Sequence, residues 1–109
     1  MQPILDHTLL TAETALDTAG AFPASLHGQY IEATIYVGFD ADSLAGAVVV
    51  ETCHDPRFTG TWANIATVTW ATADTMHYVS VTGIYRALRV RISSDVTSGT
   101  VDVRVSATT

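Results

Sequence analysis

The sequence predicts an all-β protein that folds as a single antiparallel β-sandwich of jelly-roll or immunoglobulin-like type, with seven to eight strands. Thr, Ala and Val dominate the composition, and β-branched residues fit the pleated surface of a sheet. Short segments of alternating polarity are separated by turn-forming residues about every ten positions. A chain of 109 residues is long enough for one domain with one core, so we expect residues 1–109 to form a single sandwich.

The clearest alternation lies near the C-terminus. In residues 87–93, Leu88, Val90 and Ile92 point to one face, and the residues between them point to the other. In residues 100–107 the apolar set is Val101, Val103, Val105 and Ala107. The link at residues 93–99 is rich in turn-forming residues, which predicts that the two segments pair directly as a hairpin with one buried and one solvated face.

The rest of the chain is divided in the same way. Residues 1–10 form either an extended N-terminal arm or the first strand, and a short strand or one helical turn is expected near residues 13–17. Strands are predicted at residues 29–38 and 47–54, a loop at residues 54–60 around Asp55-Pro56, and further strands at residues 64–70 and 76–81.

Composition excludes several classes of function. The net charge of −6 argues against sequence-independent binding to nucleic acid, which requires a basic surface. The single cysteine, Cys53, excludes an intrachain disulfide and a cysteine-pair zinc site. No segment approaches the length of apolar residues that spans a membrane, so we expect a chain made in the cytoplasm without membrane partners.

No set of residues in the sequence points to catalysis, a cofactor or a metal. Cys53, His54 and Asp55 have suitable chemistry, but neighbours on one strand point to opposite faces, so Cys53 and His54 cannot meet as nucleophile and base if the strand runs through both. The four histidines lie far apart in the sequence. Glu32 and Glu51 are placed on solvent faces of strands, and no phosphate-binding motif occurs. The protein is therefore not expected to be an enzyme.

The arginines and the aromatic residues each allow two interpretations. Arg89, Arg91 and Arg104 are predicted to share one solvated face near Arg86. They either pair with Asp102 and neighbouring acids, each pair contributing about 0.2–1 kcal/mol, or form an interface. Trp62, Trp70, Tyr78 and Tyr85 either pack in the core or stack on sugar rings.

The sequence resembles small β-sandwich structural proteins of tailed bacteriophage particles over roughly residues 30–107. The similarity lies in the segments at residues 48–55 (Val-Val-Val-Glu-Thr-Cys-His-Asp), 60–65 (Gly-Thr-Trp-Ala-Asn-Ile), 78–92 (with Gly83-Ile84-Tyr85-Arg86-Ala87-Leu88-Arg89-Val90) and 99–101 (Gly-Thr-Val). Its Trp and Tyr-Arg-x-Leu-Arg-Val features are also similar to discoidin-like sugar-binding jelly rolls. The chain departs from the phage pattern at residues 54–59, which form a longer and bulkier turn.

The resemblance implies a homo-oligomeric virion protein, most simply a capsid decoration or cement protein whose partners are the major capsid protein or other virion proteins. The alternative that it implies is a carbohydrate-binding module of a tail, neck or fibre, with Trp62, Trp70 or Tyr85 stacking on sugars. The candidate interface residues are Ile4, Leu5, Leu9, Leu10, Arg57, Phe58, Arg86, Arg89, Arg91 and Arg104.

Overall fold

The computed structural model describes residues 4–21, 30–40, 43–55, 57–70, 76–85 and 87–108, and within these ranges every regular element is a β-strand. The strands are β1 (Ile4–Glu13), β2 (Ala19–Ala21), β3 (Tyr30–Phe39), β4 (Ala45–Cys53), β5 (Ala63–Thr69), β6 (Met76–Tyr85), β7 (Ala87–Thr97) and β8 (Val101–Thr108). The strands predicted at residues 29–38, 47–54, 64–70 and 76–81 are confirmed with small shifts of their ends.

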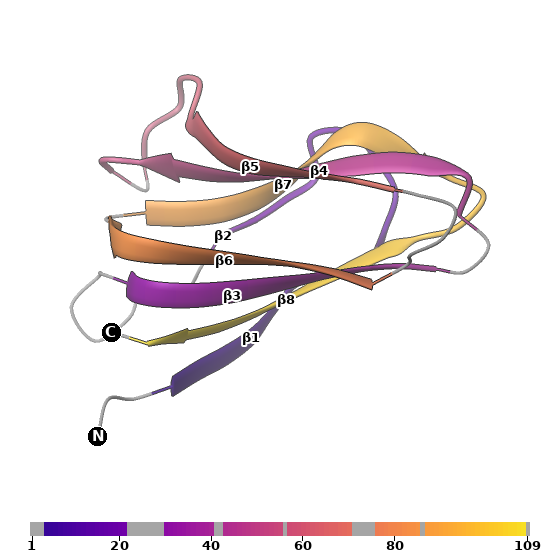
Figure 1. Cartoon of the computed structure of the whole chain (residues 1–109). Coiled ribbons are helices and arrows are strands. Elements are labelled where there is room, and N and C mark those ends of the chain that lie inside the picture. The colour runs from indigo at the N-terminus through magenta and orange to yellow at the C-terminus, as the bar shows by residue number, and fades with distance from the viewer. Residues whose placement is uncertain are drawn as a thin grey trace.

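The described strands form two four-stranded antiparallel sheets that lie face to face (Figure 1). Sheet A has the order β1-β8-β3-β6, and sheet B has the order β2-β7-β4-β5. The chain crosses repeatedly between the two sheets, which is the connectivity of a jelly roll. The predicted β-sandwich is confirmed, and of its two expected types the strand order is that of the jelly roll.

The core lies between the sheets and consists almost entirely of β-branched and other aliphatic side chains. Sheet A contributes the inward side chains of β3 and β8. These two strands are neighbours and pair without a register shift, so that Ile35, for example, lies beside Val105. Sheet B contributes Leu88, Val90 and Ile92 from β7, together with Val48 and Val50 from β4. The alternation in the sequence therefore identifies the core side of each of these strands correctly.

The predicted hairpin between the last two strands is wrong. Strand β7 pairs with β2 and β4 in sheet B, whereas β8 pairs with β1 and β3 in sheet A. Strand β7 also continues through the expected turn as far as Thr97, with Val96 buried, and Ser98 adopts a left-handed φ of 62° where the chain crosses to the other sheet. Two amphipathic strands bury their apolar faces equally well from opposite sheets, so the alternation alone did not reveal this crossing.

The N-terminal segment was expected to be either an extended arm or the first strand. From Ile4 onward, where the structure describes it, it is the first strand. Strand β1 pairs with β8 from Ile4 onward, and Leu10 is buried in the core. The short strand expected near residues 13–17 is wrong, because β1 ends at Glu13 and the chain turns there. Asp17, with a φ of 68°, lies in this turn, and the Thr18 amide donates a hydrogen bond to the Ala15 carbonyl at 3.1 Å.

The two sheets approach each other closely where β1 and β2 meet. A Cβ added to Gly20 of β2 would overlap the backbone of Leu9 on β1, with the Leu9 carbonyl carbon only 2.8 Å away. Because backbone atoms cannot move aside as a flexible side chain does, only glycine allows this approach. The sandwich is therefore closed on the side formed by β1 and β2.

Gly20→Ala should lower the free energy of unfolding by about 1–3 kcal/mol, since the added methyl group overpacks this contact. The matched control is Gly38→Ala, where the new Cβ would meet the flexible end of the Met76 side chain at 3.1 Å. Urea unfolding of the two variants measures the difference. Equal effects at both glycines would show that the close approach of β1 and β2 is absent in solution.

Candidate functional site

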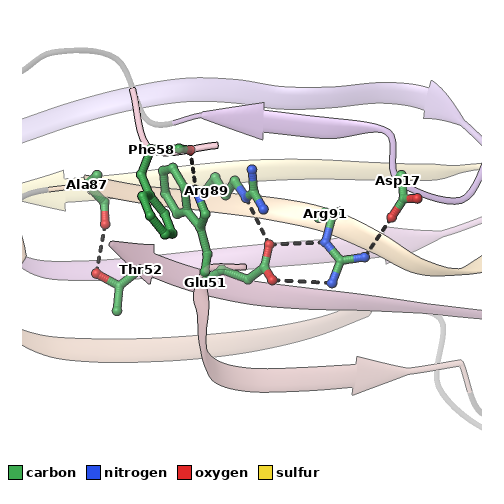
Figure 2. Close-up of polar contacts among 8 residues, drawn as sticks. Asp17, Glu51, Thr52, Phe58, Ala87, Arg89 and Arg91 are labelled. Atoms are coloured by element: carbon green, nitrogen blue, oxygen red, sulfur yellow. Dashed lines mark hydrogen bonds and ion pairs between the residues drawn. The ribbon is translucent and has the colours of Figure 1, made fainter. Parts of the chain in front are cut away.

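The outer face of sheet B carries a cluster of charged side chains around Glu51. Glu51 on β4 lies directly opposite Arg89 on β7, and Arg91 is two residues further along the same strand. Arg89 Nε donates to Glu51 Oε1 at 2.9 Å, while Arg91 donates from Nε to Oε1 at 3.1 Å and from Nη2 to Oε2 at 3.2 Å. Arg91 Nη1 also donates to Asp17 Oδ1 at 2.8 Å, so one carboxylate is held by two guanidinium groups and a second carboxylate flanks them (Figure 2).

Trp62 completes this arrangement from the loop that precedes β5. The Arg89 guanidinium carbon lies 4.3 Å from the centroid of the Trp62 ring, a distance that permits a cation–π interaction. The indole Nε1 donates to the Phe58 carbonyl at 3.0 Å, and only 5% of Trp62 is exposed. We refer to Asp17, Glu51, Trp62, Arg89 and Arg91 as the Glu51 cluster. It borders a shallow depression of about 330 Å³ on the outer surface.

The electrostatics of the Glu51 cluster favour the ionised carboxylate. Burial of Glu51, which is 3% exposed, raises its pKa, but the hydrogen bonds and charges of Arg91 and Arg89 outweigh this effect and hold the pKa below its usual value. The hydrogen bond to Glu51 likewise raises the pKa of Arg91. A lowered carboxyl pKa in the folded state means that this stabilisation is complete above the ordinary carboxyl pKa and is lost as the pH falls through the lowered value.

The expectation that Glu51 faces solvent is wrong. Glu51 is buried, and the side chains of Arg89 and Arg91 on the neighbouring strand β7 contact its carboxylate. Strand β4 is central in sheet B, and its outward residue Val49 is buried as well as its inward residues. The sequence contained one usable signal. Glu51 is a single acid in a Val-rich strand, and Arg89 and Arg91 are spaced two apart on another, so the three can form cross-strand ion pairs if the two strands are neighbours.

Arg104 does not belong to the cluster, contrary to the prediction that it shares a face with Arg89 and Arg91. It lies on β8, in the opposite sheet, where it is exposed beside Tyr36 of β3. Of the two alternatives for the arginines, pairing with acids holds for Arg89 and Arg91, but their partners are Glu51 and Asp17 and not Asp102. Asp102 Oδ1 instead accepts a hydrogen bond at 2.8 Å from the Ala12 amide, at an irregular point of β1.

The loop after β4 holds the remaining candidates with reactive side chains. The strand predicted to continue through His54 ends at Cys53, so the condition that would keep Cys53 and His54 apart is not met, and Cys53 Sγ lies 3.5 Å from His54 Nδ1. The His54 ring also packs against Phe58, with 5.5 Å between the ring centroids. Asp55 accepts from the amide and side chain of Arg57, which lowers the pKa of Asp55, and both Arg57 and Phe58 are exposed.

The proposed sugar-stacking residues are not assembled into an exposed aromatic platform by the described part of the chain. Trp62 is buried beneath Arg89, and Trp70 is partly buried against the core. Tyr85 ends β6, but its side chain lies outside the described structure, as do those of Ile4 and Leu5 and all of Arg86. Leu10 is a core residue and Leu9 packs against the core, so neither forms an exposed interface.

The outer face of sheet A carries a group of large exposed side chains that the sequence did not predict to lie together. Tyr36 on β3 pairs directly with Tyr78 on β6, and Met76 lies two residues from Tyr78 on the same strand. Tyr78 is 71% exposed and Met76 is 65% exposed. Three large exposed side chains of this kind beside a sheet edge are typical of a contact surface.

Two other kinds of feature are absent from the described ranges. They contain no group of three or more His, Cys, Asp or Glu side chains with the geometry to hold a metal ion. No helix in them is long and apolar enough to cross a bilayer.

The fold of this chain is similar to those of known protein structures, although its sequence is not similar to a known family. No protein-family model matches the sequence, and no curated protein sequence matches it. The structure is similar to the crystal structure of the SPBc2 prophage-derived protein YomS, with a TM-score of 0.70 and 15% sequence identity over 100% of this chain and 96% of that one. The chain shares its fold with a prophage-derived protein.

A second similar structure belongs to Bacillus endospore appendages, which form disulfide-linked pili. The TM-score is 0.51 and the sequence identity 19%, with 99% of this chain and 90% of that chain covered. Both likenesses extend over nearly the whole of each chain.

Proposed function

We propose that this chain is a non-enzymatic structural protein of a bacteriophage particle, specifically a capsid decoration or cement protein that stabilises the head. The observation that carries the proposal is the full-length structural match to the prophage-derived protein YomS. A pilus protein as the second match supports a role in an extracellular or virion-associated assembly. Double-sheet jelly rolls are also a common architecture of viral capsid proteins.

The chemistry of the Glu51 cluster supports a structural role over catalysis. Its one buried carboxylate accepts hydrogen bonds from two arginines, and its pKa is lowered, so it is poorly suited to accept or donate a proton near neutral pH. The ring of Trp62 is covered by Arg89. These interactions hold β4, β7 and the loop before β5 in a fixed arrangement.

The decoration role requires a surface that binds the major capsid protein or another virion protein. The exposed loop at Arg57 and Phe58 offers a cation and an aromatic ring together, and Arg104 adds a cation on the other sheet. Arginine and aromatic residues are enriched where proteins meet. Bound across neighbouring capsid subunits, such a protein adds contact area that resists internal pressure.

Mass spectrometry of purified particles tests the location directly. A copy number comparable with that of the major capsid protein is expected for a decoration protein. A small copy number would place the chain in the neck, tail or fibre and contradict the decoration role. Absence from the particle would contradict the virion role altogether.

The double variant Arg57→Ala/Phe58→Ala should reduce occupancy of particles with little change in the thermal melt of the isolated protein, because both side chains are exposed and contact Asp55 and His54 of the same loop. Leu16→Ala is the control, since it removes another exposed apolar side chain at a different place. Occupancy is measured by densitometry after particles stripped of the protein are mixed with each variant. Full occupancy by the double variant would show that binding uses another surface.

The carbohydrate alternative predicts that sugars perturb tryptophan fluorescence. In a Trp70→Phe variant the remaining signal comes from Trp62, and we expect oligosaccharides to leave it unchanged because Arg89 covers the ring. Arg89→Met in the same background should shift the emission and serves as the positive control. A saturable response of Trp62 to a sugar would favour the carbohydrate-binding module.

A further inference from the structure

The four sheet edges of the sandwich are protected to very different degrees. A sheet edge presents backbone groups that pair readily with another strand, and proteins block this pairing with charges, bulges, short strands or covering segments. The edge strands are β1 and β6 in sheet A and β2 and β5 in sheet B (Figure 1).

Three of these edges are blocked. Strand β1 carries Asp6 and Glu13 and has two register irregularities, with a left-handed φ of 50° at Ala12. Strand β2 has only 3 residues and lies against β1. Strand β5 is uncharged, but Ile65 is an extra residue that bulges between the paired positions Asn64 and Ala66.

Strand β6 has none of these protections over most of its length. It contains no Asp, Glu, Lys, Arg or Pro. Its pairing with β3 is regular from Met76 to Thr82, and the only irregularity comes after Thr82. In the part of the chain that the structure describes, no strand pairs with its other side.

We propose that β6 pairs antiparallel with β6 of a second copy of this chain, which joins the two sheets A into one continuous sheet. A two-fold axis through Val79 would place Met76 opposite the partner's Thr82 and Tyr78 opposite the partner's Ser80. Outward residues then meet outward residues, and core-side residues meet core-side residues, because the paired positions differ by an even number.

The absence of charged residues from β6 favours a second copy of this chain as the partner at this edge. Each chain has a net charge of −6, so two copies repel each other, and the repulsion is weakest where they meet along a surface that carries no charge itself. Strand β6 is a long, regular edge with no charge. A basic strand from another protein would find no acidic residue on β6 itself to select it, whereas a second β6 matches it in length, polarity and alternation.

The exposed apolar group beside this edge favours the same contact. Tyr78 and Met76 lie on the outward face of β6, and Tyr36 is their neighbour on β3. The two-fold axis brings this group next to its copy, so that aromatic rings from both chains cover the junction of the joined sheets. The proposal rests on the sheet edge and this group, and it holds or fails independently of the phage role.

Sedimentation of the full chain over a range of concentrations tests the proposal. We expect a species of twice the monomer mass, and Ser80→Lys should abolish it, because the two introduced lysines lie diagonally across the axis and repel each other. Ser80 is exposed, so the variant should keep the melting temperature of the dilute parent protein. Thr69→Lys, at an exposed threonine of the edge strand β5, is the matched control and should still dimerise.

A charge-swap experiment identifies the partner strand. Ser80→Glu should also be monomeric alone, but an equimolar mixture of the Ser80→Lys and Ser80→Glu chains should regain the dimer. A parent chain that stays monomeric at every concentration would overturn the proposal, as would a dimer that survives Ser80→Lys. Failure of the mixture to associate would show that β6 does not meet β6 and would overturn the proposal as well.

Discussion

Replacing both Arg89 and Arg91 with methionine is expected to lower the free energy of unfolding by about 3–5 kcal/mol at neutral pH, the effect of leaving a buried charge without its partner. Glu51 is 3% exposed and is held in the Glu51 cluster by these two guanidinium groups. Methionine keeps most of the apolar length of each arginine, so the loss reports on charge more than on packing. Urea unfolding at pH 7 measures the effect.

Two further measurements separate this explanation from a general loss of packing. Adding Glu51→Met to the double variant removes the unpaired carboxylate and should restore most of the lost stability. Acidification should also reduce the difference in the free energy of unfolding between the parent and the double variant. In the parent the pKa of Glu51 is lowered and its stabilisation is lost as pH falls, whereas without the arginines burial raises the pKa and protonation relieves the cost. A gap that does not change with pH would contradict the role assigned to Glu51.

Leu88→Ala should lower the free energy of unfolding by about 2–5 kcal/mol, because it opens a cavity between the two sheets. Leu88 is 1% exposed and belongs to the core cluster, whereas Leu44, which is 65% exposed, lies outside it. Leu44→Ala makes the same chemical change at the surface and is expected to have little effect. Similar unfolding curves for the two variants would show that the inward face of β7 has been assigned wrongly.

Several elements were predictable because they depend on neighbours in the sequence. The alternation of Leu88, Val90 and Ile92 specifies a strand and its buried side, since successive side chains on a strand point to opposite faces. The same rule located β3, β4 and β8 and established the all-β class. Exposed Arg57 and Phe58 also followed from a loop around Asp55-Pro56.

The candidate site was less predictable because it depends on which strands become neighbours. The alternation predicts that Arg89 and Arg91 share a face, but their partner Glu51 lies 38 and 40 positions away in the sequence. Glu51 was placed in solvent because strands with one polar face usually expose it. Its burial follows from the pairing of β4 with β7 and from Trp62, which no local pattern reports.

By itself, then, the sequence determined a sandwich of two sheets and located strands β3 to β8 with their inward faces, but it did not reveal β2. Only the tertiary structure decided that β7 and β8 belong to different sheets, that Arg104 is separated from Arg89, and that Glu51 is enclosed by arginines. The physical reason is the range of the interactions involved. Side-chain alternation is set by backbone geometry within a strand, whereas pairing and register are chosen by contacts among strands far apart in the chain, which many arrangements of equally amphipathic strands satisfy.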